Sequence, residues 1–266
     1  MIPDPAKVRV WEARAEVYDR YCRSTPLFSL VSNRLIDLLP ADLDGAVLDI
    51  GAGSGLTSDL LLARHPRCEA ILVEPSQAMI DIARVRLAGR RARFLAMGLD
   101  GALGLDLHAN AAVASASMHF LDFDPAFATL AQIVVPGGHI AFNLWYHHWQ
   151  ETAHTHGMSG WKSIAAAACL EAQLAPPVPP PPPNPKTRPD LMSAQQRHGF
   201  ELVLERRDED VTPVVAGVNF QAMDVDWPVK GLEPAARLAL LQRMRELAQD
   251  QVETVVSTRF LFRRLL

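Results

Sequence analysis

The strongest constraint on the fold is a short apolar segment that runs directly into a glycine-rich turn. Residues 46–50 are Ala-Val-Leu-Asp-Ile, typical of a buried strand, and residues 51–55 are Gly-Ala-Gly-Ser-Gly. Helical spacing of apolar side chains follows over residues 57–64. Glycine permits a sharp turn and lets a ligand approach main-chain atoms without a Cβ in the way. This strand–turn–helix unit therefore predicts an open α/β sheet with a ligand at the turn.

The same alternation continues along most of the chain. Short apolar runs alternate with helical stretches, and crossovers of this kind place helices on both faces of a parallel sheet. The predicted strands are residues 46–50, 70–73, 93–97, 111–114, 139–144, 200–206 and 257–262. Further helices are predicted at residues 77–87, 125–134 and 234–252. We therefore predict a single domain over residues 1–266, a doubly wound, mostly parallel seven-stranded sheet preceded by a helical lead-in at residues 1–40.

A segment unlike the rest follows the fifth predicted strand, at residues 145–195. It begins with aromatic and histidine side chains and ends in a proline-rich tract that holds nine of the 20 prolines. A polyproline run is stiff and extended and cannot enter a sheet. We predict a cap over the ligand site, joined to the sixth strand by a proline strap. The predicted substrate contacts are Trp145, Tyr146, His147 and Trp149, through stacking and ring-edge contacts.

Charge and composition narrow the kinds of partner. The chain has 26 Lys and Arg against 30 Asp and Glu, a formal charge of −4, and no basic run that would favour nucleic acid. We find no secretory signal pattern and no apolar stretch long enough to span a membrane. The three cysteines lack metal-like spacing and suit a reducing compartment. We therefore expect a cytoplasmic protein with a small-molecule substrate, no nucleic-acid or membrane partner, and a homodimer as one allowed oligomeric state.

Histidines gather in the predicted cap, at His147, His148, His154 and His156. Their spacing matches no known ligand pattern, and no nearby cysteine adds to the set. We therefore predict no metal site.

The glycine-rich turn departs from the dinucleotide fingerprint G-x-G-x-x-G, because Gly55 comes one residue early. Its spacing is D-x-G-x-G-x-G from Asp49, and Glu74 follows the next predicted strand, where a carboxylate can accept both hydroxyls of a ribose. In these residues the chain resembles the class I S-adenosylmethionine-dependent methyltransferases. Further similarity lies at residues 11–19, 115–122, 133–139 and 199–200. The resemblance implies methyl transfer, with S-adenosylmethionine as the cofactor.

The resemblance also implies which residues hold the cofactor. The methionine part would lie against the glycine-rich turn, at Gly51, Ala52, Gly53 and Gly55. Asp49 would fix this turn, Glu74 would hold the ribose, and Ser115 would border the site after the fourth strand.

The adenine would lie near Pro75 and Met79 and contact the backbone of Gly98 and Leu99. The chain departs from the family pattern there. Gly98 stands where an acid is common, and Asp100 would replace that acid only after a register shift. Asn110 replaces a common aspartate at the start of the fourth strand.

Two residues are candidates for catalysis. His119 follows the fourth predicted strand and could accept a proton near neutral pH, and Tyr18 could reach the cofactor or substrate from the lead-in. Packing is the alternative for both. Three other functions stay open: a cyclase or lyase that uses the cofactor without methyl transfer, a non-enzymatic cofactor-binding or proline-tract interaction protein, and, least favoured, a nicotinamide dehydrogenase.

Overall fold

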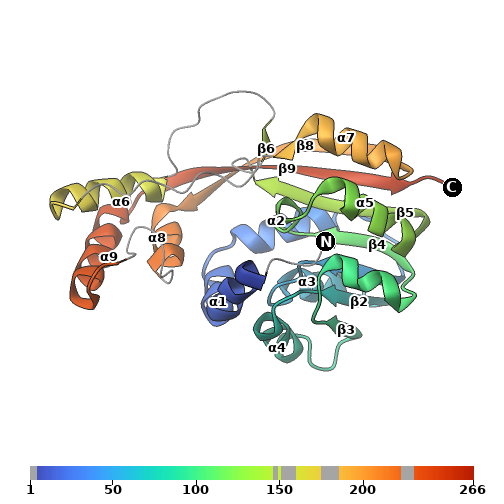
Figure 1. The fold of residues 1–266 in the computed structure, drawn as a ribbon, viewed down its shortest axis with the longest axis horizontal. Coiled ribbons are helices and arrows are strands. Elements are labelled where there is room, and N and C mark those ends of the chain that lie inside the picture. Colours follow the sequence, from blue (N-terminus) through green and yellow to red (C-terminus); the bar gives the residue numbers. More distant parts are fainter. Residues whose placement is uncertain (1–4, 146–148, 151–159, 175–185, 223–230) are drawn as a thin grey trace.

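The computed structural model describes residues 5–145, 149–150, 160–174, 186–222 and 231–266, and its centre is a seven-stranded sheet (Figure 1). The strand order is β3-β2-β1-β4-β5-β9-β8. The strands are β1 Gly45–Ile50, β2 Cys68–Val73, β3 Ala92–Leu95, β4 Ala109–Ala114, β5 Val134–Trp145, β8 Phe200–Pro213 and β9 Val252–Arg264. Strands β1 to β5 are parallel, and β9 is antiparallel to both its neighbours. The predicted mostly parallel seven-stranded sheet is confirmed.

Helices cover both faces of this sheet because successive strand residues point to opposite sides. On β1, Val47 and Leu48 are both fully buried but belong to different apolar clusters. The cluster around Val47 includes side chains of α2 (Leu27–Ile36), α3 (Leu56–Arg64) and α4 (Gln77–Arg86). The cluster around Leu48 includes side chains of α5 (Phe123–Ile133) and α7 (Arg188–Arg197). Burial of both faces explains the near-continuous apolar runs in the sequence.

The strand order reverses direction between β1 and β4. The chain passes from β1 to β2 on one side and later reaches β4 on the other. Open α/β sheets bind ligands at this point, outside the carboxyl ends of the strands. The fold therefore brings together three segments at one edge: the glycine-rich turn after β1, residues 74–76 after β2, and residues 115–117 after β4.

A second, smaller core lies at one end of the molecule. Strands β8 and β9 form a long ribbon, and Figure 1 shows helices packed together at its far end. These helices are α6 (Gly160–Glu171), α8 (Val214–Ala222) and α9 (Pro234–Ala248), and their buried side chains form a cluster of their own. Trp161 packs so closely on Gly217 that a Cβ there would lie 3.0 Å from the indole.

The structure changes some of the predicted boundaries. The predicted insert 145–195 includes residues 188–195, which belong to α7 beside the sheet. The long predicted helix ends at Ala248 rather than residue 252, because Asp250 has a φ of +64° and the chain turns there into β9. Helix α8 was not predicted, because its valine-rich sequence carries no clear helical period. Most of the proline tract, at 175–185, lies outside the described residues.

Two short strands that follow β5 form a separate pair. Strands β6 (Trp149–Gln150) and β7 (Lys186–Thr187) pair in parallel, which places the two ends of the predicted cap side by side.

Candidate functional site

The glycine-rich turn is built from residues with left-handed backbone. Gly51, Gly53 and Gly55 have φ values of +62°, +53° and +81°, a region that disfavours other residues. A Cβ on Gly51 would lie 2.6 Å from the Cβ of Ser117, so β4's following segment packs directly on the turn. A Cβ on Gly53 would meet only the ring of Tyr18, at 3.7 Å. A side chain on Gly53 would therefore enter a cavity, whereas a side chain on Gly51 would meet protein.

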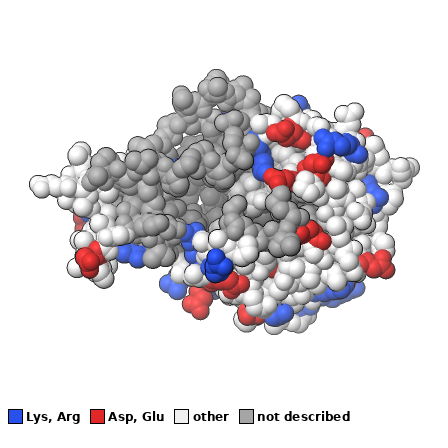
Figure 2. All heavy atoms as spheres, in the orientation of Figure 1, with Lys and Arg blue, Asp and Glu red and all other residues white. Residues whose placement is uncertain are grey.

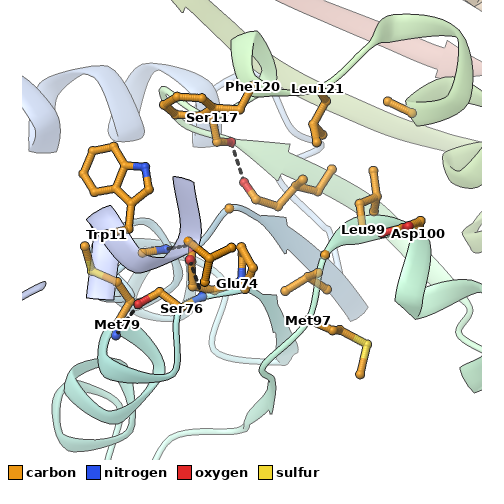
Figure 3. A pocket seen from close by; sticks show the side chains of 18 of the residues that line it. Trp11, Glu74, Ser76, Met79, Met97, Leu99, Asp100, Ser117, Phe120 and Leu121 are labelled. Atoms are coloured by element: carbon orange, nitrogen blue, oxygen red, sulfur yellow. Dashed lines mark hydrogen bonds between the residues drawn. The ribbon is translucent and has the colours of Figure 1, made fainter. Parts of the chain in front are cut away.

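Glu74, at the end of β2, places a buried carboxylate beside this turn. It accepts hydrogen bonds from the backbone N–H of Gly53 at 3.0 Å and of Ser76 at 2.9 Å (Figure 3). Burial raises the pKa of Glu74, and the two backbone donors oppose that rise. The arrangement holds both carboxylate oxygens in a defined orientation at the cavity wall.

Asp49 lies behind the turn rather than in the cavity. Its side chain is buried within β1 and accepts a 2.6 Å hydrogen bond from the hydroxyl of Ser58 on α3. Burial raises the pKa of Asp49 to about 7, and the Glu74 charge adds to the rise. Asp49 thus ties β1 to the helix that follows the turn.

A cavity of about 280 Å³ lies at the carboxyl ends of β1, β2 and β4. Its lining includes nine of the predicted site residues: Tyr18, Gly51, Gly53, Glu74, Pro75, Met79, Gly98, Leu99 and Ser115. The cavity wall also includes Asp100, which the sequence placed there only after a register shift, and residues to which the sequence assigned no site role, among them Val8, Trp11, Ser76, Met97, Ser117, Phe120 and Leu121 (Figure 3). Asp100 reaches the cavity because Leu99–Leu105 forms a 3₁₀ helix directly after Gly98, a register that strand periodicity does not reveal.

A smaller cavity of about 30 Å³ continues along the glycine-rich turn and shares Tyr18, Gly51, Gly53 and Ser115 with the first. Ala52 lines this second cavity. Its polar wall is a chain of hydroxyls, in which Ser32 of α2 contacts Thr57 at 2.9 Å and Ser115 at 3.1 Å.

Helix α1 (Pro5–Ser24) covers the larger cavity and is attached at two points. Glu12 accepts the backbone N–H groups of Gln77 and Ala78 at 2.5 and 3.0 Å, at the N-terminus of α4. Asp19, which is buried, pairs with Arg86, and Arg86 also donates to the carbonyl of Ser54 in the glycine-rich turn at 2.9 Å. The cover of the cavity is therefore joined by ion pairs and hydrogen bonds to its floor.

Aromatic rings extend along this cover. Trp11 makes edge-on contacts with Phe120 at 6.0 Å and with Tyr18 at 5.3 Å between ring centroids. Tyr18 in turn contacts Phe28, whose ring meets Trp145. Burial raises the pKa of Tyr18 well above its usual value, and a side-chain hydrogen bond with Cys22 adds to the rise.

Several predicted site residues lie elsewhere. His119 is buried, its ring packs on Phe120 at 4.1 Å, and it does not line either cavity. Trp145 packs in a small cluster with Leu27 and Val31. Trp149 lies in the main core, 2% exposed, with its ring 5.2 Å from Phe260. The predicted substrate contact by Trp149 is therefore wrong for this structure, because β6 turns the indole into the core.

The remaining predicted site residues either lie outside the described residues or do not line the cavities. Tyr146 and His147 lie outside the described residues, as do His148, His154 and His156. Gly55 packs against α4, where a Cβ would lie 3.0 Å from that of Ala83, and it does not reach the cavities.

Neither a metal cluster nor a membrane-spanning helix is found in the part of the chain that the structure describes. No group of three or more His, Cys, Asp or Glu side chains there is placed to bind a metal ion. No helix there combines the length and apolar character needed to cross a bilayer.

Comparison with known families identifies one domain. A family model described as a methyltransferase domain matches residues 47–138. This range begins in β1, includes the glycine-rich turn and Glu74, and ends at Gly138 within β5, so it contains most of the cavity wall.

Solved structures with similar folds cover most of the chain. A geranyl diphosphate C-methyltransferase from Streptomyces coelicolor A3(2) is 13% identical, with a TM-score of 0.52 over 89% of this chain and 79% of its own. A cyclopropane synthase from Mycobacterium tuberculosis is 14% identical, with a TM-score of 0.54 over 88% and 82%. The cyclase SpnF is 18% identical, with a TM-score of 0.50 over 88% and 81%. At these identities the likeness supports the fold.

Proposed function

We propose that this chain is a class I S-adenosylmethionine-dependent methyltransferase whose methyl acceptor is a small molecule with apolar or aromatic surface. The observation that carries the proposal is the cavity at the strand ends. Glu74 forms part of its polar wall, and Trp11, Phe120 and Leu121 form part of its apolar wall. A ligand with both a sugar and apolar groups fits such a wall.

The described residues fit the cofactor. Glu74 offers carboxylate oxygens to the ribose hydroxyls, and charge-assisted hydrogen bonds of this kind are the strong ones. The hydroxyls of Ser32, Thr57 and Ser115 offer partners to the polar end of the methionine in the smaller cavity. Asp100 and the backbone of Gly98 and Leu99 border the remaining, adenine side.

The chemistry needs little from the protein beyond placement. The bound cofactor supplies an electrophilic methyl group on a positive sulfur. In-line displacement of this kind is accelerated by holding the reactants aligned and excluding water. Helix α1 excludes water on one side of the cavity, and the glycine-rich turn and residues 115–117 supply a rigid floor.

The neutral hydroxyl of Tyr18 is proposed to orient a ligand at the junction of the two cavities. His119 was predicted as a general base, but its position behind Phe120 gives it no contact with the cavity. We therefore expect Tyr18→Phe to lower kcat/KM about tenfold, the effect of one lost hydrogen bond. His119→Ala should leave the pH–rate profile unchanged in shape. An inflection present in the wild-type pH–rate profile and absent from that of His119→Ala would restore the base role.

A cyclase is the second candidate, because one protein of similar fold is the cyclase SpnF. In that reaction the cofactor would act through its positive charge or serve only as structure, and no methyl group would leave it. The described residues suit both reactions, so the product must decide.

The partner class follows from charge. On the face drawn in Figure 2, acidic and basic side chains of the described residues are interspersed and form no continuous basic stripe. With a formal charge of −4, this supports a small-molecule acceptor over nucleic acid. Cys22, Cys68 and Cys169 are free and buried, which suits a reducing compartment, so we propose a cytoplasmic enzyme.

The function is tested by calorimetry and isotope transfer. Titration with S-adenosylhomocysteine should show saturable binding, and no binding up to millimolar concentration would overturn the proposal. Incubation with methyl-labelled cofactor and a panel of terpenoid, phenolic and polyketide acceptors should give a labelled product. A converted but unlabelled product would favour the cyclase.

A further inference from the structure

Asn143 is a polar side chain buried in the core next to the site. It lies two residues before the end of β5 and is 1% exposed. Its Oδ1 accepts a 2.8 Å hydrogen bond from the backbone N–H of Ala116. Its Nδ2 has no hydrogen-bond partner in the described part of the chain. An unsatisfied buried donor costs about 1–3 kcal/mol, so the unpaired Nδ2 of Asn143 lowers the stability of the fold.

The residue that Asn143 holds has an unusual backbone. Ala116 has a φ of +55°, in the left-handed region that a non-glycine residue enters only at a cost of about 1–2 kcal/mol. The hydrogen bond from its N–H to Asn143 offsets part of that cost. Asn143 therefore stabilises a turn that this sequence would otherwise disfavour.

This turn shapes the wall of the cavity. Ser115, Ala116 and Ser117 all line the larger cavity, and Ser115 also lines the smaller one. Ser117 donates a 2.5 Å hydrogen bond to the carbonyl of Ile50, immediately before the glycine-rich turn (Figure 3). Its Cβ fills the space that a side chain on Gly51 would need. A change in the backbone of Ala116 would therefore move both serines and the floor of the site.

We propose that Asn143 is a positioning residue for methyl transfer, which holds residues 115–117 in the conformation that the cofactor and acceptor require. The inference rests on the proposed function. Asn143 acts through the turn, and no contact with a ligand is needed. A misplacement of about 1 Å at a reacting centre can cost a hundredfold in rate, so a small movement of this turn is enough to matter.

Two substitutions should separate stability from activity. Asn143→Leu removes the unpaired Nδ2 but also leaves the Ala116 N–H without its acceptor, so the melting temperature should change little, while kcat/KM falls at least tenfold. Asn143→Asp keeps an oxygen that accepts the Ala116 N–H, so activity should stay within about threefold of wild type. The buried charge of this variant should lower the melting temperature at neutral pH. A residue with only a structural role would change stability and activity in the same direction.

Asn110 provides the matched control. It lies near the amino end of β4, beside Gly45 and at the opposite edge of the sheet. Asn110→Leu should leave kcat/KM unchanged. If Asn143→Leu does not fold, Asn143→Ala carries the same test, because it removes the acceptor without adding bulk.

A crystal structure of Asn143→Leu supplies a readout that does not depend on activity. We expect the φ of Ala116 to become negative and Ser117 to leave the carbonyl of Ile50. An unchanged turn, or wild-type kcat/KM in Asn143→Leu, would overturn the inference. Failure of the wild-type chain to bind S-adenosylhomocysteine would overturn the proposed function instead, while the structure of the variant still decides whether Asn143 holds the turn.

Discussion

At the scale of single residues, the site depends on backbone groups that hold a few buried acids. Glu74 is oriented by the N–H groups of Gly53 and Ser76, and Asp49 by the hydroxyl of Ser58. Each carboxylate is buried, so each has a raised pKa. These acids therefore link cofactor binding, stability and pH.

Replacing Glu74 should weaken cofactor binding with little effect on the fold. We expect Glu74→Ala to raise the Kd for S-adenosylhomocysteine by about 5- to 150-fold, because it loses charge-assisted bonds worth about 1–3 kcal/mol. Titration calorimetry measures this change. Glu69→Ala, at the opposite end of β2, is the control and should bind normally. Equal affinities in the two variants would contradict the ribose assignment.

A side chain at Gly53 should block the site. Gly53→Val places atoms in the cavity near Tyr18, so saturable cofactor binding should disappear while the circular dichroism spectrum stays largely native. The φ of +53° adds backbone strain, which Gly89→Val reproduces, since Gly89 has a φ of +77° with open space around its Cβ position. Gly89→Val should lose stability but bind the cofactor. Loss of binding in both would mean that strain, and not occupancy, is the cause.

Asp49 should make the stability of the chain fall as pH rises. Its carboxyl pKa rises from 3.8 to about 7 on folding, so between these values the folded state holds a proton that the unfolded state has released. The contribution of Asp49 to the free energy of unfolding should therefore be largest below pH 4 and should decrease toward pH 7. Each unit of pKa difference is worth about 1.4 kcal/mol.

Urea unfolding of wild type and Asp49→Asn at pH 5 and pH 8 measures this contribution. Asparagine keeps an acceptor for Ser58 but cannot ionise. The variant should gain stability relative to wild type as pH rises. Parallel pH dependence in the two proteins would show that Asp49 does not titrate in this range.

At the scale of elements, α1 joins the cover of the cavity to its floor. Glu12 contacts the N-terminus of α4, and Asp19 contacts Arg86, which also reaches the glycine-rich turn. The amino-acid pattern predicted a helical lead-in, but contacts between residues 65 to 67 positions apart in the chain are not visible in it.

Loosening this attachment should speed cofactor release. Glu12→Gln weakens the contact with the N-terminus of α4, where a negative charge is favoured by about 0.3–1 kcal/mol. We expect the dissociation rate of S-adenosylhomocysteine, measured by stopped flow, to rise about two- to fivefold. Glu16→Gln, on the exposed side of the same helix, should leave that rate unchanged. Equal rates in Glu12→Gln and wild type would show that α1 does not control release.

At the scale of the whole molecule, the sheet core and the smaller helical core are separate. The sheet and its covering helices build the cofactor site, and the three-helix cluster of α6, α8 and α9 stands on the long β8–β9 ribbon (Figure 1). In this cluster, α6 precedes the proline tract, whereas α8 and α9 follow it. The predicted cap therefore contributes only part of the cluster. Glu253 of β9 accepts the backbone N–H of Gly160 at 2.7 Å, which ties α6 to the ribbon.

Local pattern alone determined much of this protein. The apolar runs and their spacing predicted the seven strands, and the positions of Gly51, Gly53 and Glu74 predicted a ligand site at the turn, for which the family resemblance implied the cofactor. These features can be read locally because a strand buried on both faces must be apolar, and a left-handed turn needs glycine.

The tertiary structure decided the rest. It put Trp149 in the core, His119 behind Phe120, and Trp11 and Asp100 at the cavity. It also joined α8 to α6 and α9. No local pattern encodes these outcomes, because they depend on which distant segments meet and on which way a side chain points once a short 3₁₀ turn or strand is set by its neighbours. Apolar and aromatic residues suit a core and a binding site equally well, so only their surroundings distinguish the two.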